Sequence, residues 1–111
     1  MRFQVFHRRV AIAESELDRL DPSMGIANGT FVPTTQFSAA ADSFSLRDEQ
    51  DGARELTSDL ELRTSSGDLV PTEWIRLDDF SAVLGNEGYE VTVCADSSET
   101  FQRYFGVQGS L

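Results

Sequence analysis

The sequence predicts a small α+β domain, in which a mostly antiparallel sheet of about five or six strands has two main helices packed on one face. Two patterns support this prediction. Several short segments alternate apolar and polar residues, which is typical of strands buried on one face. Two other segments carry apolar residues three and four positions apart, the spacing of a helix face. Because 111 residues is the usual size of one domain, we expect residues 1–111 to form a single domain.

The N-terminal residues are expected to form a β-hairpin. Residues 2–7 and 10–15 both alternate, and the pair Arg8-Arg9 is the short break between them. Tight hairpin turns usually contain Asn-Gly or Gly-X, so this turn has an unusual composition.

An irregular connector over residues 21–37, DPSMGIANGTFVPTTQF, follows the hairpin, and the rest of the chain is organised around it. It holds two glycines, two prolines and two phenylalanines. Asn28-Gly29 has the composition of a tight turn and can close a small hairpin. The alternatives are a loop that only packs Met24, Ile26 and Phe31 over a sheet edge, and a binding loop, because such loops often carry functional sites.

Two helices are expected after the connector. The first has Thr35 as its N-cap and ends near Leu46 or frays beyond it. The second starts at a capping box, with Asp96 as N-cap and Glu99 three residues later. The apolar stripes of the two helices are Phe37, Ala40, Ala41 and Phe44, and Phe101, Tyr104 and Phe105. Residues 107–111 are expected to be a loose tail.

The other expected elements are a strand at 56–64, a hairpin loop at 65–68, a return strand at 69–77, a short helix capped by Asp78 or Asp79 and ended by Gly85, and a strand at 89–95. Pro71 lacks the N–H group that a sheet ladder needs. Its segment is therefore expected to start on a sheet edge or at a bulge.

The net charge restricts the kinds of partner. A formal charge of −10 repels the phosphates of nucleic acids and attracts basic proteins. The alternative is that the acidity only keeps the protein in solution. The chain contains arginine but no lysine, which excludes Schiff-base chemistry and a P-loop lysine. The candidate partner-binding residues are Asp48, Glu49, Asp51, Asp59 and Glu61.

The reactive side chains do not form a catalytic pattern. His7 follows a strand and precedes two arginines, so we expect it to be exposed, with its protonated form disfavoured by these neighbours. Cys94 is expected to be inert because Asp96 and Glu99 oppose a thiolate. A single cysteine can form neither an internal disulfide nor a thiolate zinc cluster. We therefore predict no catalytic residue, no metal site and no cofactor.

Two segments, DPSMGIANGTFVPT and WIRLDDFSAVLGNEGYEV, resemble a group of small uncharacterised bacterial proteins with the pattern D-P-x-M-G…G-x-F-x-P-T. The matching residues are Asp21, Pro22, Met24, Gly25, Gly29, Phe31, Pro33 and Thr34. The resemblance covers most of the chain. It implies no activity, but it agrees with residues 21–37 being the organising element.

Two functions from different classes follow from these observations. The favoured one is a non-enzymatic interaction module, similar to an immunity or inhibitor protein, that binds a basic partner. The alternative is a small-molecule-binding protein or minor enzyme with a pocket under the 21–37 connector, where Met24, Asn28, Phe31 and Trp74 would bind the ligand. A homodimer formed through an exposed strand edge or through a sheet face is compatible with both. No apolar run has the length of a membrane span and no signal segment is recognised, so the expected location is the cytoplasm, without membrane contact.

Overall fold

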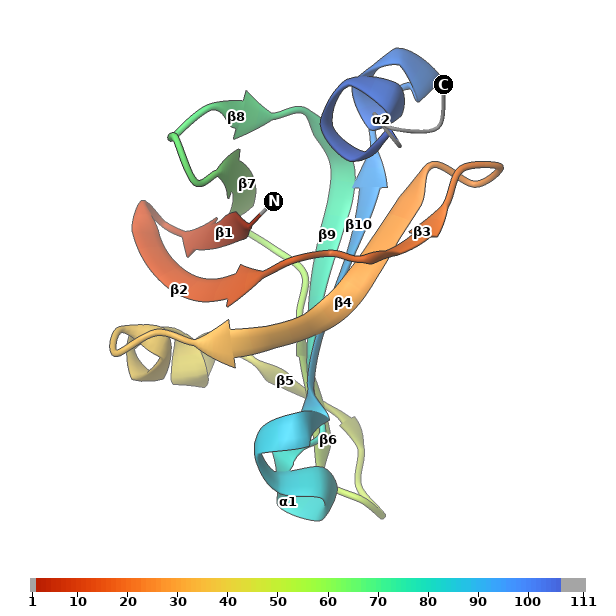
Figure 1. Ribbon diagram of the computed structural model, residues 1–111. Helices are drawn as coiled ribbons and strands as arrows, with labels where there is room; N and C mark the ends of the chain where they lie inside the picture. The colour runs from red at the N-terminus through yellow and green to blue at the C-terminus, as the bar shows by residue number, and fades with distance from the viewer. Residues whose placement is uncertain (1, 107–111) are drawn as a thin grey trace.

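The computed structural model describes residues 2–106 apart from the side chain of Asp48, and the expected tail at 107–111 lies outside the described residues. About half of this part of the chain forms an antiparallel β-sheet (Figure 1). The strands are β1 (Phe3–His7), β2 (Val10–Ser15), β3 (Arg19–Asp21), β4 (Ile26–Pro33), β5 (Ser45–Asp48), β6 (Ala53–Leu56), β7 (Leu60–Thr64), β8 (Leu69–Val70), β9 (Thr72–Asp79) and β10 (Tyr89–Ala95). The order of paired strands is β5-β6-β9-β10-β4-β2-β1-β7-β8, and β3 pairs with β4 beside this path.

The helical segments are short. They are the 3-10 helices η1 (Phe37–Ser43) and η2 (Gly85–Gly88) and the α-helices α1 (Ser81–Leu84) and α2 (Ser98–Phe105). The prediction of five or six strands with two main helices packed on one face is therefore wrong, because the sheet has ten strands. The first predicted helix is only the short 3-10 helix η1, which carries most of the apolar stripe at 37–44. The chain then continues as strand β5.

The sheet curves until its two halves meet. β8 pairs with β7 and β9 pairs with β10, yet only Pro71 separates β8 from β9. The stretch 69–79 therefore joins one end of the strand path to its middle. As a result, β7, β1, β2, β4, β10 and β9 surround the core as a small barrel (Figure 1). Pro71 lies at the break in this strand, where no ladder hydrogen bond is required of it.

β4 joins the two halves of the sheet. Residues 26–30 of this strand pair with β10, and residues 31–33 pair with β2. The expected turn at Asn28-Gly29 is therefore wrong, because both residues lie in the middle of an eight-residue strand. The turn lies earlier, at 22–25, where Gly25 has a φ of 66°. Pairing with neighbouring strands on both sides thus overrides the local turn composition.

The predicted hairpin of β1 and β2 is confirmed, and His7 pairs with Val10 across its turn. Arg8 and Arg9 both have positive φ, 49° and 71°, a conformation that costs about 1–2 kcal/mol for each L-residue. Arg8 is held by Asp59, since its backbone N–H donates to the Asp59 carbonyl at 3.2 Å and its Nε donates to Asp59 Oδ2 at 3.1 Å. The unusual turn composition is therefore stabilised by contacts with a distant residue.

Of the predicted strand at 56–64, only Leu60–Thr64 forms a strand of its own, β7, because Leu56 ends β6 and residues 57–59 connect the two. The break comes at Asp59, which has a φ of 60°. At the last helix, Ser97 caps α2 in place of Asp96, because Ser97 Oγ accepts the backbone N–H of Thr100 at 3.1 Å. The predicted strand at 89–95 is confirmed as β10.

Two aromatic clusters lie at the two ends of the core. Near η1, the Phe37 ring lies 5.7 Å from Phe31 and 5.5 Å from Phe44, measured between centroids. Near α2, the Phe105 ring lies 5.0 Å from the ring of Phe3 and 5.5 Å from that of Phe101. The chain therefore uses its many phenylalanines to close both ends of the barrel, where strands alone leave the core open.

His7 is buried, which corrects the expectation that it is exposed. Its side chain is only 5% exposed and its Nε2 has no hydrogen-bond partner among the described residues. Burial is the larger cause of a pKa below the ordinary value of 6.5, the positive charge of Arg8 lowers the pKa further, and Asp59 acts in the opposite direction. Of the two arginine neighbours, Arg8 therefore acts on the His7 pKa in the predicted direction, but burial contributes more.

This lowered pKa gives an expected pH dependence of stability. As pH falls below about 6.5, the unfolded chain binds a proton at His7 that the folded protein does not bind, so the free energy of unfolding decreases. Chemical denaturation of the wild type and of His7→Leu between about pH 7.5 and 5.5 measures the effect. We expect the wild type to lose more stability than the variant over this interval. Equal losses would show that His7 does not cause the pH dependence.

Candidate functional site

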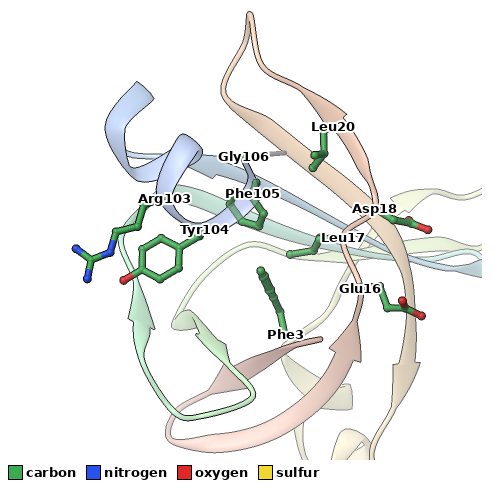
Figure 2. A pocket seen from close by; sticks show the side chains of 9 residues that line it. All are labelled: Phe3, Glu16, Leu17, Asp18, Leu20, Arg103, Tyr104, Phe105 and Gly106. Atoms are coloured by element: carbon green, nitrogen blue, oxygen red, sulfur yellow. The ribbon is translucent and has the colours of Figure 1, made fainter. Parts of the chain in front are cut away.

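A hollow of about 510 Å³ lies between residues 16–20, at the junction of β2 and β3, and the C-terminal end of α2 (Figure 2). Its apolar surface comes from Phe3, Leu17, Leu20 and Phe105. The rest of its lining is Glu16, Asp18, Arg103, Tyr104 and Gly106. The volume falls in the range of about 300–1,000 Å³ that is usual for ligand sites. An apolar floor and a charged rim make this hollow the best candidate site.

The floor of the hollow is the end of the barrel core that α2 covers. Phe3 and Leu17 are each 2% exposed, and Phe105 is also buried. Figure 2 shows the Leu17 side chain pointing toward the space between the other two. At the wall, the Tyr104 hydroxyl donates to the Leu69 carbonyl at 3.5 Å, which connects α2 to β8. An apolar group entering the hollow would thus meet a surface already fixed by packing.

Residues 16–18, which we call the ridge, separate this hollow from the surface beside it. Leu17 has a φ of 47°, an uncommon and strained conformation for a bulky residue. Its N–H donates to Ser15 Oγ at 3.1 Å, and the same hydroxyl donates to the Thr30 carbonyl at 2.7 Å. A Cβ at Gly29 would lie 2.9 Å from Ser15 Oγ and 3.1 Å from Leu17 Cα. The ridge is therefore held against β4 by a glycine that allows this close approach.

The rim of the hollow carries charges of both signs. Glu16 and Asp18 point away from the apolar floor on the far side of the ridge, and Arg103 points outward on the opposite rim (Figure 2). Arg2 lies 3.9 Å from a carboxylate oxygen of both Glu14 and Glu16, and Asp18 forms no ion pair among the described residues. A second hollow of about 100 Å³ is lined by these three carboxylates on their side of the ridge. Negative charge is thus concentrated beside the apolar site.

The lining of the hollow combines an apolar floor with charged residues at its rim, a composition typical of binding sites. The described lining contains no histidine, cysteine or hydroxyl nucleophile other than the Tyr104 phenol. No hydrogen bond within the described residues positions the carboxylates of Glu16 and Asp18, and both residues are exposed. Catalytic acids and bases are normally held in place by such bonds. The site is suited to hold an apolar group on its floor and a cation beside its acidic rim.

The four residues predicted to bind a ligand are not brought together. Met24 lies in the exposed turn between β3 and β4, and Phe31 is buried in the core. Asn28 lies on β4, where its Nδ2 donates to Thr92 Oγ1 at 2.8 Å. Trp74 is on β9 and is 39% exposed. None of the four lines the hollow beside the ridge.

The five residues predicted to bind a partner lie in two places. Glu49 and Asp51 are exposed in the turn between β5 and β6, and the side chain of Asp48, in β5, lies outside the described part of the chain. Asp59 precedes β7 and Glu61 lies within it, and their carboxylates form ion pairs of 3.1 Å and 3.2 Å with arginines of the same chain. These last two charges are therefore partly neutralised by folding.

Cys94 is half-buried on β10. Burial raises the pKa of its thiol, and the nearby carboxylate of Glu73 raises it further, so the thiolate is disfavoured. Within residues 2–106, no group of three or more His, Cys, Asp or Glu side chains has the geometry of a metal site. No helix in the same range is long and apolar enough to cross a membrane.

Comparison with known proteins returns no match. No family model matches the sequence, and no curated protein and no solved structure is significantly similar to the chain. The resemblance to small bacterial proteins therefore stays a prediction.

The hollow could not be predicted from the sequence because the residues that line it resemble ordinary structural positions. Phe105 and Tyr104 were predicted only as a core-facing helix stripe. Glu16 and Asp18 stand between two strands, where exposed charge is common. The one usable signal is Leu17, an isolated large apolar residue between these carboxylates. Its left-handed backbone, which shapes the ridge, cannot be read from composition.

Proposed function

We propose that the protein is a non-enzymatic interaction module that binds a basic protein partner through its acidic surface, similar to an immunity or inhibitor protein. The observation that supports this proposal is the distribution of ion pairs in the folded chain. Arginines such as Arg19 and Arg76 already bind carboxylates of the same molecule, at 2.8 Å and 2.9 Å. By contrast, the exposed carboxylates of Asp18, Asp42 and Glu87 form no ion pair among the described residues.

Among the described residues, folding therefore pairs most of the arginines, although not Arg9, Arg54 or Arg103, and leaves most of the carboxylates unpaired. With a formal charge of −10, the surface attracts basic proteins over several ångströms and increases their association rate. Because exposed charges are screened by salt over about 8 Å at physiological ionic strength, binding of this kind weakens as salt rises.

Affinity capture tests this proposal. The tagged protein is incubated with nuclease-treated lysate of its source cells at about 20 mM and about 150 mM salt, and any captured protein is then purified and titrated by calorimetry. We expect a basic protein that binds saturably and more weakly at the higher salt. Absence of saturable binding to any basic protein at low salt would contradict the proposal.

The volume and apolar floor of the hollow favour small-molecule binding as a second candidate function. This hollow is lined by residues 16–20 and the end of α2, and not by the 21–37 connector in which a pocket was expected. A thermal-shift screen with metabolites tests the idea. Chemical-shift changes at Leu17 and Tyr104 would place a bound compound in the hollow, and the absence of any stabilising compound would count against this function.

A further inference from the structure

We propose that the hollow beside the ridge receives one large apolar side chain of the basic partner, and that a lysine or arginine next to this side chain pairs with Glu16 and Asp18. This inference rests on the proposed function and specifies where the partner binds. The partner segment is therefore basic and apolar at once, and not simply cationic.

The apolar part of the inference follows from the floor. Phe3, Leu17 and Phe105 pack against one another in the absence of a ligand, so little reorganisation is needed on binding. The lining includes three aromatic rings, with Tyr104 at the wall (Figure 2). Aromatic rings contact one another favourably in tilted and edge-to-face arrangements. A phenylalanine, tryptophan or leucine side chain therefore fits this surface better than a polar one.

The basic part of the inference follows from the rim. Asp18 has no ion-pair partner among the described residues, and the contact of Glu16 with Arg2 is long, at 3.9 Å. Arg2 lies at the same distance from Glu14, so its one positive charge does not neutralise both Glu16 and Asp18. Arg2 lines the second hollow together with Glu14, Glu16 and Asp18, so a cation on the far side of the ridge would meet three acids and one base, a net negative lining. Charge complementarity thus selects a basic residue at this position.

The ridge determines how the apolar and the basic side chain of the partner are arranged. Because Glu16 and Asp18 point away from the floor, one side chain cannot satisfy both the apolar hollow and the carboxylates (Figure 2). Two neighbouring side chains of an extended segment that crosses the ridge can do so. The backbone of Leu17 is fixed by Ser15 and by the close approach of Gly29, so the separation of the two sites is built into the fold.

The experiment uses the full chain and three short peptides of equal length, which contain lysine with phenylalanine, lysine with alanine, or glutamine with phenylalanine. Binding is measured by NMR titration at low salt, following the backbone amides of Leu17, Asp18 and Tyr104. The variant Glu16→Gln/Asp18→Asn removes two charges from the ridge. Its matched control, Asp42→Asn/Glu87→Gln, removes the same charge from η1 and η2 at the other end of the molecule (Figure 1).

We expect the lysine-phenylalanine peptide to bind with shifts at these three amides. Replacing its phenylalanine with alanine should weaken binding about tenfold, as expected for one buried large side chain. The ridge variant should weaken it about three- to tenfold and the control variant should not, because each exposed ion pair contributes about 0.2–1 kcal/mol. Unchanged melting temperatures would show that both variants are folded.

Other outcomes overturn the inference in distinguishable ways. If both variants lose affinity equally, only net charge matters, and the proposed function stands without this site. If the glutamine-phenylalanine peptide binds as tightly as the lysine-phenylalanine peptide, the hollow takes apolar groups without regard to charge. If no peptide binds while affinity capture yields a basic partner, the partner binds elsewhere. Failure of both peptide binding and affinity capture would contradict the proposed function itself.

Discussion

Replacing Asp78 with alanine is expected to lower the free energy of unfolding by about 3 kcal/mol, near the lower end of the range for breaking a buried ion pair. The Asp78 side chain is buried and accepts hydrogen bonds from Arg47 Nη1 at 2.8 Å and from Arg76 Nε at 2.9 Å. Without this carboxylate, Arg76 loses its ion pair and Arg47 keeps only a long contact with Glu55, at 3.8 Å. Both arginines are more than a third exposed, so water reduces the cost to the lower end of the range.

Urea denaturation of matched variants measures this effect. Asp78→Asn keeps the shape of the side chain but removes its charge, and should lose most of the same stability. Asp79→Ala removes the neighbouring carboxylate, which only accepts the Ser81 N–H at 2.8 Å, and should cost about 1 kcal/mol. A loss below about 1 kcal/mol for both Asp78 variants would show that the ion pairs of Asp78 contribute little.

The different roles of Asp78 and Asp79 show how far the local sequence could predict the fold. Either Asp78 or Asp79 was expected to cap the short helix, but its N-cap is Phe80, which makes no side-chain cap hydrogen bond, and Asp79 accepts the Ser81 N–H from one position earlier. The role of Asp78 depends on Arg47, which is 31 residues distant in sequence. Arg47 lies on β5 and comes close to Asp78 only because β5 pairs with β6 and β6 pairs with β9. Elements with strong local patterns, such as β10, were predicted correctly. Contacts that depend on which strands pair could not be predicted from one sequence.

The same limit explains the errors at the connector and at the site. Asn28-Gly29 has the composition of a turn, but it lies within β4, which is paired on both sides. The absence of a side chain at Gly29 allows the ridge to pack closely against β4. The hollow forms because the β2–β3 junction and the end of α2 meet across the barrel end. No periodic pattern links Leu17 with Phe105, so a candidate site there could not be derived from the sequence.

Replacing Gly88 with alanine is expected to reduce stability by about 3 kcal/mol, at the upper end of the usual cost of overpacking. A Cβ at this position would lie 2.5 Å from the carbonyl carbon of Phe80 and 2.6 Å from its oxygen. These are backbone atoms, so a side-chain rotation cannot relieve the contact. The two backbones are also hydrogen-bonded, because the Phe80 N–H donates to the Gly88 carbonyl at 2.7 Å. Moving the two backbone segments apart would break this hydrogen bond at the start of β10.

The measurement is again urea denaturation, with Asn86→Ala as the control because Asn86 is exposed in the same 3-10 helix. The control should change stability by no more than about 0.5 kcal/mol, as is usual for surface substitutions. A similarly small change for Gly88→Ala would mean that α1 and η2 can move away from β10 at little cost. Gly88 belongs to η2, which precedes β10, whereas α2 follows the other end of β10 (Figure 1), so folded Gly88→Ala protein should still bind the lysine-phenylalanine peptide with unchanged affinity. Loss of affinity in a folded variant would show that the two ends of the barrel are coupled.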